Sequence, residues 1–345
     1  MLIQAVCNRT LTTCRHISSD LRSSLPSQDS DVLPIPVISK LAPLTFEQNR
    51  ELRKRHLSPS LKAHYDGSPA GPIKLASGKG TYLYDVEGKK YLDCVNNVCH
   101  VGHCHPRIVQ AASAQLATLN TNSRYLHDNI VRLAERITSL MPNPLEVAIF
   151  VNSGSEANDL ALRLARNHTQ RQDIYCVDGA YHGNSTATLA ISPYNKYSAI
   201  ESPIGTVKLT CPDSYRLGLS PADTTEKCVA EFLRLLDSRN EKPAAFIVES
   251  LICCGGQVVL PPNYLKRMHA LIRERGGLAI ADEVQAGFGR VGDHMWAFES
   301  QVPSLLAFLV QQYKILRAEE VRGRGQCQIS SRFVSLRALL VQKHK

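Results

Sequence analysis

The sequence has no long apolar run, no regular cysteine spacing and no excess of one charge in its middle. A membrane-spanning helix needs roughly 20 consecutive apolar residues, and because no run approaches this length we expect no membrane partner. The eleven cysteines do not show the spacing of a small secreted disulfide scaffold, which favours a reducing compartment. There is also no internal repeat.

The formal charge of +9 is confined to the two ends of the chain. Residues 1–56 hold eight Lys/Arg against five Asp/Glu, and residues 301–345 hold eight against two. The intervening residues 57–300 hold 24 of each sign. A basic surface spread over the fold would indicate a nucleic-acid partner, but this distribution does not, and we expect none.

The first 19 residues contain Arg9 and Arg15, several Ser and Thr, and no acid. This composition is typical of a mitochondrial transit peptide, with an ordinary untargeted N-terminal segment in the cytoplasm as the alternative. Composition and pattern predict four segments. These are a presequence and linker (1–43), an N-terminal segment with a hairpin (44–110), a large domain (111–300) and a divergent basic tail (301–345).

Hydrophobic periodicity predicts an α/β fold. A hairpin is expected over residues 80–93 around Glu87-Gly88, followed by a helix from Pro106 and another with Asp128 as its N-cap. Strands and helices then alternate: strands at 147–151, 174–178, 245–249 and 278–282, helices at 155–167, 226–237 and 263–275. This rhythm predicts a mostly parallel sheet with helices on both faces.

Two turns follow predicted strands and carry polar groups. In the turn at residues 152–158, Gly154 allows a tight bend, Ser155 is expected to cap the helix, and the free N–H groups form an anion site. After the next strand, Tyr181 could lie flat on a planar heterocycle, and Gly183 would let the backbone come close. The alternatives are a capped turn that binds nothing and a tyrosine buried in the core.

Glu249 and Asp282 each end a predicted strand. Two carboxylates at one edge of a sheet are costly unless they face cations or hydrogen-bond donors, so their placement indicates a polar site. For Asp282 taken alone, the alternative is a helix or turn cap.

A cluster of cysteines and histidines raises zinc binding as an outside alternative. It lacks the two evenly spaced ligand pairs of a zinc finger, so we assign no metal site to it. Its members are Cys94, Cys99, His100, His103, Cys104 and His105.

The motifs, taken in order, resemble the class III pyridoxal-phosphate (PLP) aminotransferases, whose fold is type I. The segment Ala281-Asp282-Glu283-Val284-Gln285 and the turn Ser153-Gly154-Ser155-Glu156-Ala157-Asn158 carry the resemblance. Residues 96–106, 119–129 and 158–166 look most like the ethanolamine-phosphate and phosphohydroxylysine phospho-lyase branch, with alanine–glyoxylate aminotransferase 2 as its neighbour. The resemblance implies a small amine or amino acid substrate, a homodimer, and either transamination or phosphate elimination.

The resemblance also implies a role for individual residues. Gly154 and Ser155 would bind the PLP phosphate, Tyr181 would stack on the ring, and Asp282 would hold the protonated ring nitrogen. Val284 would pack on the opposite ring face, Gln285 would bond the phenolic oxygen, and His182 and Glu249 would complete the cofactor site. Arg124 and Tyr125, with Asn122, are candidates for binding the substrate, and a surface salt bridge is the alternative role for Arg124.

The resemblance covers roughly residues 45–298 and then stops. The family continues to a Thr-Met-(Gly/Ala)-Lys motif whose lysine forms the Schiff base, and counting places that lysine on Val310 or on Lys314. We therefore predict an incomplete large domain without the C-terminal small domain, and Lys314 is the candidate lysine. The alternative is a catalytically inactive protein that binds PLP or pairs with a complete subunit. The start of the tail could form a strand on the open sheet edge, or leave that edge exposed.

Overall fold

The computed structural model describes residues 42–69, 71–95, 98–143, 145–194, 205–239 and 242–302, and the backbone of 307–314 and 335–342. The chain divides between Lys74 and Leu75 into two compact units. All but the last two residues of the predicted presequence and linker lie outside the described residues, so the targeting prediction has no structural counterpart.

The first unit contains helix α2 (Phe46–His56), which the sequence pattern did not predict. Its start is specified by a capping box: the Thr45 side chain accepts from the Gln48 N–H, and the Gln48 side chain accepts from the Thr45 N–H. An ion pair of 3.2 Å between Arg50 and Asp66 connects the helix to the turns that follow it.

The second unit begins with an antiparallel sheet of three short strands, β1 (Leu75–Lys79), β2 (Tyr82–Asp85) and β3 (Lys90–Leu92). The predicted hairpin is confirmed as β2 and β3, and Gly88 supplies the positive φ of 82° that their turn requires. β1 was not predicted.

Two helices follow, α3 (Pro106–Thr118) and α4 (Asp128–Thr138). Pro106 occupies the first turn of α3, as predicted. The predicted N-cap of α4 is wrong by one residue, because the His127 ring accepts the Asn129 N–H and caps the helix. Asp128 lies in the first turn, where its charge is favourable to the helix dipole.

The main sheet has the order β4-β10-β9-β8-β7-β5-β6. All of its strands run parallel except β10, which is antiparallel to both neighbours. The strands are β4 (Leu145–Val151), β5 (Ile174–Val177), β6 (Thr206–Leu209), β7 (Ala245–Glu249), β8 (Leu278–Asp282), β9 (Ala307–Lys314) and β10 (Ser335–Gln342). The predicted mostly parallel sheet is therefore confirmed, and the start of the tail forms a strand against β8.

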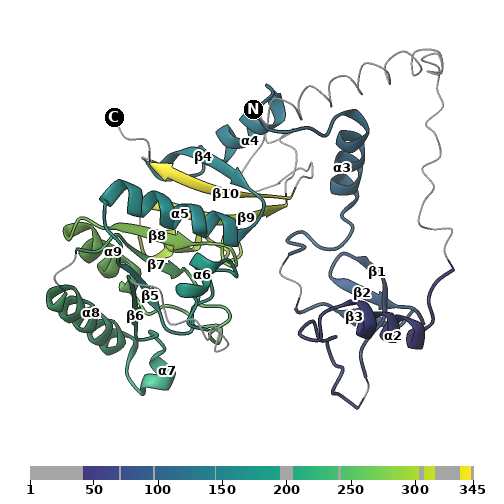
Figure 1. Cartoon of the computed structure of the whole chain (residues 1–345), viewed down its shortest axis with the longest axis horizontal. Helices are drawn as coiled ribbons and strands as arrows, with labels where there is room; N and C mark the ends of the chain where they lie inside the picture. The colour runs from purple at the N-terminus through teal and green to yellow at the C-terminus, as the bar shows by residue number, and fades with distance from the viewer. Residues whose placement is uncertain are drawn as a thin grey trace, which may run out of the picture. The chain divides into compact units, whose positions relative to one another are not determined.

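Helices cover both faces of this sheet (Figure 1). α5 (Gly154–Thr169) packs on one face against Ile247 and Ile280. α8 (Pro221–Ser238) and α9 (Tyr264–Glu274) cover the other face, where Phe246 and Ala279 point. There is a hydrophobic core on each face of the sheet, and successive residues of a strand point into one core and then the other. Both faces are buried, which is why these strands are continuous apolar runs in the sequence. The short helices are α6 (Thr186–Ala190), α7 (Ser214–Leu217) and the 3₁₀ turn η2 (Ala297–Ser300).

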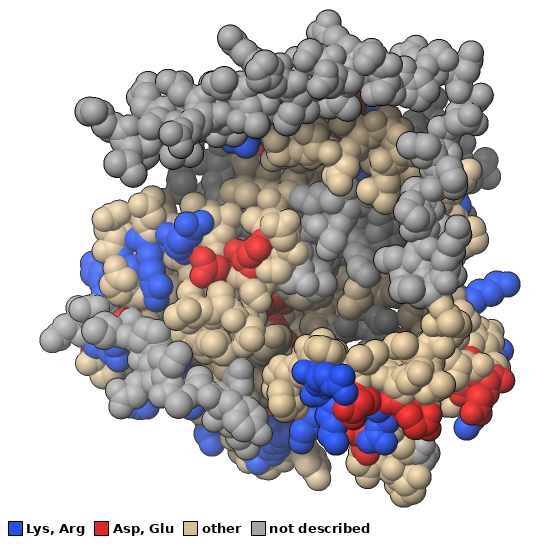
Figure 2. Space-filling view, turned by 45° about the vertical axis from the view of Figure 1, so that its right-hand side comes forward, with Lys and Arg blue, Asp and Glu red and all other residues tan. Residues whose placement is uncertain are grey.

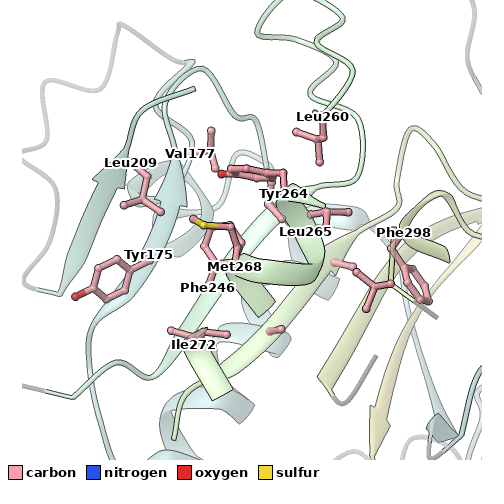
Figure 3. Close-up of a cluster of buried hydrophobic side chains, with 14 of the residues drawn as sticks. Tyr175, Val177, Leu209, Phe246, Leu260, Tyr264, Leu265, Met268, Ile272 and Phe298 are labelled. Carbon is pink, nitrogen blue, oxygen red and sulfur yellow. The ribbon is translucent and has the colours of Figure 1, made fainter. Parts of the chain in front are cut away.

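Figure 3 shows how α9 fills the second core. Its apolar side chains point at the strands, and the fully buried ones include Tyr264, Met268 and Ile272. α8 begins at Pro221 and not near 226 as predicted, because Ser220 caps the helix and accepts from the Asp223 N–H.

The surface is mixed in charge. On the face drawn in Figure 2, Lys and Arg side chains lie beside Asp and Glu side chains, as the even balance of residues 57–300 suggests. Within the part of the chain that the structure describes, no helix is long and apolar enough to cross a membrane.

Candidate functional site

Glu249 and Asp282 lie side by side at the carboxyl ends of β7 and β8. The two residues are partners in the parallel ladder, and each is only 3% exposed. The sequence prediction that both carboxylates meet at one sheet edge is confirmed. Open α/β sheets bind ligands at this edge, so the pair is the natural centre of a site.

The Asp282 carboxylate accepts three hydrogen bonds. Its Oδ2 lies 2.8 Å from His182 Nδ1 and 2.9 Å from Asn158 Nδ2. Its Oδ1 accepts from the Val284 N–H at 3.0 Å. The simple capping alternative accounts only for the last of these bonds, whereas the side chains of Asn158 and His182 hold the carboxylate from two other elements.

The turn before α5 differs in one detail from the prediction. Ser153 is the N-cap and accepts from the Glu156 N–H, because its backbone is extended while Ser155 is already helical. The Ser155 hydroxyl is therefore available to accept from the Asn184 N–H at 3.1 Å. The first N–H groups of a helix have no intrahelical acceptor, so this end of α5 is suited to an anion.

Gly183 packs directly on this turn. A Cβ at Gly183 would lie 2.5 Å from Ser155 Oγ and 2.8 Å from Ser155 Cα, and the backbone has a φ of 129°. Any side chain would collide with the helix start. The strand-end loop after β5 and the turn after β4 are thus in contact only because residue 183 is glycine.

Glu249 is held by backbone donors of two loops. It accepts from the Tyr181 N–H at 2.9 Å and from the Cys253 N–H at 3.1 Å. Burial raises the pKa of Glu249 to about 7, and the neighbouring charge of Asp282 adds to this, while the two N–H bonds oppose it. Tyr181 itself is 37% exposed, so the core-tyrosine alternative is wrong.

Sequence reasoning did not select Glu283, although it is fully buried beside Asp282. Its carboxylate accepts the N–H groups of Ala297 and Phe298, both at 2.8 Å, and so caps η2. Burial raises the pKa of Glu283 to about 7. The sequence did carry a sign of this second role, because the motif has two adjacent acids. The carboxylate of Asp282 faces the site, and that of Glu283 binds the start of η2.

Asn158 was quoted only as part of a motif and was not selected as a site residue. It is 1% exposed and lies on the buried face of α5, next to Ala157 and Ala161. A buried amide among apolar helix residues needs hydrogen-bond partners. The position of Asn158 in the apolar pattern of the helix therefore indicated a polar contact in the interior.

The other predicted residues lie in different places. Val284 and Gln285 are half-buried directly after β8. Arg124 and Tyr125 are exposed in the turn between α3 and α4, where the Arg124 N–H donates to the Asn122 side chain. Among the described residues, neither is hydrogen-bonded to Glu249 or Asp282. Of Lys314 the structure describes only the backbone, at the end of β9.

The cysteine and histidine cluster is dispersed. His103 Nε2 bonds Asp93 at 2.7 Å, and His100 Nε2 lies 2.8 Å from the Phe288 carbonyl oxygen. Among the described residues, no three His, Cys, Asp or Glu side chains are placed to hold a metal ion. The zinc hypothesis therefore has no support from the geometry.

Comparison with known proteins gives consistent matches. The class-III aminotransferase family model matches residues 66–308. An alanine–glyoxylate aminotransferase 2-like protein of Drosophila melanogaster is 45% identical over 75% of this chain and 54% of its own length. The human mitochondrial alanine–glyoxylate aminotransferase 2 is 37% identical over 74% of this chain and 54% of its own. This chain spans about half the length of these curated relatives.

Among solved structures, a phospholyase from Arthrobacter in complex with phosphoethanolamine has the same fold. The TM-score is 0.73 at 29% identity, and the match covers 85% of this chain and 66% of the other.

Proposed function

We propose, because this chain belongs to the class III aminotransferase family, that its strand-edge site binds pyridoxal phosphate and serves chemistry on a small amine or amino acid. The family is PLP-dependent. The reaction is transamination, or elimination of phosphate from a phosphorylated amine. The relatives support both, since one is named an aminotransferase and another a phospholyase bound to phosphoethanolamine.

The observation that carries the proposal is the buried Asp282 carboxylate with its three donors. A buried carboxylate needs donors or a cation as partners, and a protonated pyridine nitrogen would be both. When bound, PLP supplies a ring that takes up the electron pair left as a bond at the substrate Cα breaks.

The remaining residues fit the same group. Gly154 and Ser155 place the N–H groups at the start of α5 where a phosphate can bind. We call this turn, together with Gly183 that packs against it, the phosphate cradle. Tyr181 presents an accessible ring, and Val284 and Gln285 follow the acid on the same loop. We assign these residues, with His182 and Glu249, to holding the cofactor.

The position of the family lysine decides between activity and binding alone. Asp282 pairs with Val310, and Lys314 follows four positions further along β9. At about 3.3 Å per residue this is roughly 13 Å beyond the level of Asp282. The observation favours the alternative of a chain that holds PLP without covalent attachment, alone or paired with a complete subunit.

The test is to add PLP to the purified chain, follow its absorption spectrum, then reduce with borohydride and map any labelled lysine. Saturable binding that is weakened in Asp282→Asn and retained in Asp213→Asn is the expected result. A label on Lys314 would establish covalent attachment, whereas saturable binding without a label supports the binding-only form. No saturable binding at all would contradict the proposed function.

Two finer proposals accompany this one. Mitochondrial targeting by the first 19 residues is supported by their composition and by the mitochondrial human relative. A fusion of residues 1–45 to a fluorescent protein tests it, with Arg9→Glu/Arg15→Glu as the control. A homodimer is proposed by analogy with the family, and the size of the protein in solution tests it.

A further inference from the structure

We propose that Asn158 is a positioning residue that, together with His182, saturates Oδ2 of Asp282 and so leaves Oδ1 as the atom that meets the cofactor's ring nitrogen. The inference rests on the proposed function, because it concerns how that site would hold PLP. It adds a residue and an atomic assignment that neither the motifs nor the relatives' names supply.

The hydrogen-bond count at Asp282 is the first step. A carboxylate offers about two lone-pair positions on each oxygen. Oδ2 already receives two donors, Asn158 Nδ2 at 2.9 Å and His182 Nδ1 at 2.8 Å. Among the residues that the structure describes, Oδ1 receives one donor, the Val284 N–H at 3.0 Å. A further donor such as a pyridinium N–H therefore finds an unused position on Oδ1 and none on Oδ2.

The orientation of the Asn158 amide is the second step. Its Nδ2 also donates to the His182 carbonyl oxygen at 2.8 Å. If the amide were turned over, its oxygen would face both that carbonyl and the carboxylate, and three acceptors would meet without a proton. The donor must therefore point at Asp282. Because both bonds come from one nitrogen, the amide is held between β8 and the loop that carries Tyr181 and His182.

The position of Asn158 on α5 is the third step. Gly154 and Ser155 form the first turn of this helix and Asn158 lies one turn further, on its buried face. One rigid element thus carries both the proposed phosphate cradle and the residue that orients Asp282. The spacing between the residues that would hold the phosphate and the residue that orients Asp282 is thereby set by about one helical turn, roughly 5.4 Å of rise.

The experiment uses the full chain and pyridoxamine phosphate, labelled with ¹⁵N in its ring, as a probe that needs no lysine. The variants are Asn158→Asp, which replaces the donor by an acceptor, and Asn158→Leu, which removes it. Asn167→Asp is the matched control, because Asn167 is exposed on the same helix. The readouts are the dissociation constant and the ¹⁵N shift of the ring nitrogen at pH 7, which reports its protonation.

We expect a protonated ring nitrogen in the wild type and the control. In both Asn158 variants the dissociation constant should rise about tenfold or more, as on losing an outer hydrogen-bond partner, and the shift should move toward the neutral ring. If the wild type binds the probe and the Asn158 variants have the same dissociation constant and ¹⁵N shift, this inference alone is overturned. If the wild type does not bind the probe, the proposed function is overturned. If both variants fail to fold, a wild-type structure with the probe decides: a ring nitrogen bonded to Oδ2 contradicts the assignment.

Discussion

Gly183 and Ser155 show how closely single residues constrain this site. The loop after β5 touches the start of α5, and the contact leaves no room for a methyl group. Sequence motifs alone identified both residues, but their contact joins positions nearly thirty residues apart and could not be read from spacing. The same holds for Asp282, whose partners Asn158 and His182 come from two other elements.

Replacement of Gly183 by alanine should weaken cofactor binding. The new Cβ would collide with Ser155, so the cradle must open, and we expect a loss of about 1–3 kcal/mol in unfolding free energy together with weaker binding of pyridoxamine phosphate. Urea unfolding and fluorescence titration measure the two effects. Gly218→Ala is the control, because Gly218 also has positive φ but nothing lies within 4 Å of its Cβ position. Equal effects of the two substitutions would refute the steric argument.

Glu249 should make folding stability fall as pH rises. Its folded pKa of about 7 is above the ordinary value of 4.5, so the folded state binds the proton more tightly. The associated stability is fully present below pH 4.5 and is lost as pH rises through 7. Relative to the wild type, Glu249→Gln should gain about 3 kcal/mol between these limits. Denaturation at several pH values tests this, and the exposed Glu226→Gln should show no such trend.

At the scale of elements, the strand-end edge is where prediction succeeded. Strands β7 and β8 match their predicted bounds because both are continuous apolar runs closed by an acid. The predicted cap residues Asp128 and Ser155 were displaced because neighbouring side chains made the capping bonds. β6 was missed because its four residues, Thr-Val-Lys-Leu, are not a continuous apolar run, and β10 was missed because its arginine and glutamine interrupt the apolar pattern.

Removal of residues 303–345 should destabilise the sheet. β9 is hydrogen-bonded to β8, and β10 lies between β9 and β4. The truncated chain would therefore expose the edge of β8 and leave β4 without a partner strand. We expect aggregation and loss of a cooperative unfolding transition, measured by light scattering and calorimetry. Removal of residues 343–345 alone is the control. A truncated chain that remains monomeric and unfolds cooperatively would show that the tail is dispensable.

At the scale of the whole molecule, apolar side chains on the segment around α3 and α4 face solvent. Leu116 is 67% and Val131 is 61% exposed. Large apolar side chains that face solvent favour association when they gather into a patch. The bounds of the four segments expected from the sequence stay predictions, and the two compact units divide elsewhere, between Lys74 and Leu75.

The chain should therefore self-associate in solution. Sedimentation velocity over a concentration series should show species larger than the monomer, and Leu116→Gln/Val131→Gln should shift the distribution toward the monomer. Tyr215→Gln is the control, because Tyr215 is exposed on α7. A wild-type chain that is monomeric at all concentrations would contradict both this prediction and the proposed homodimer.

The sequence by itself determined the fold class, the family and the order of the site motifs, because apolar periodicity and strand-end polar residues are local signals. Only the tertiary structure decided which donors meet Asp282, why residue 183 must be glycine, and that Glu283 caps η2. These contacts depend on how helices and strands distant in sequence come together, and hydrogen-bond geometry over a few ångströms is not encoded in spacing along the chain.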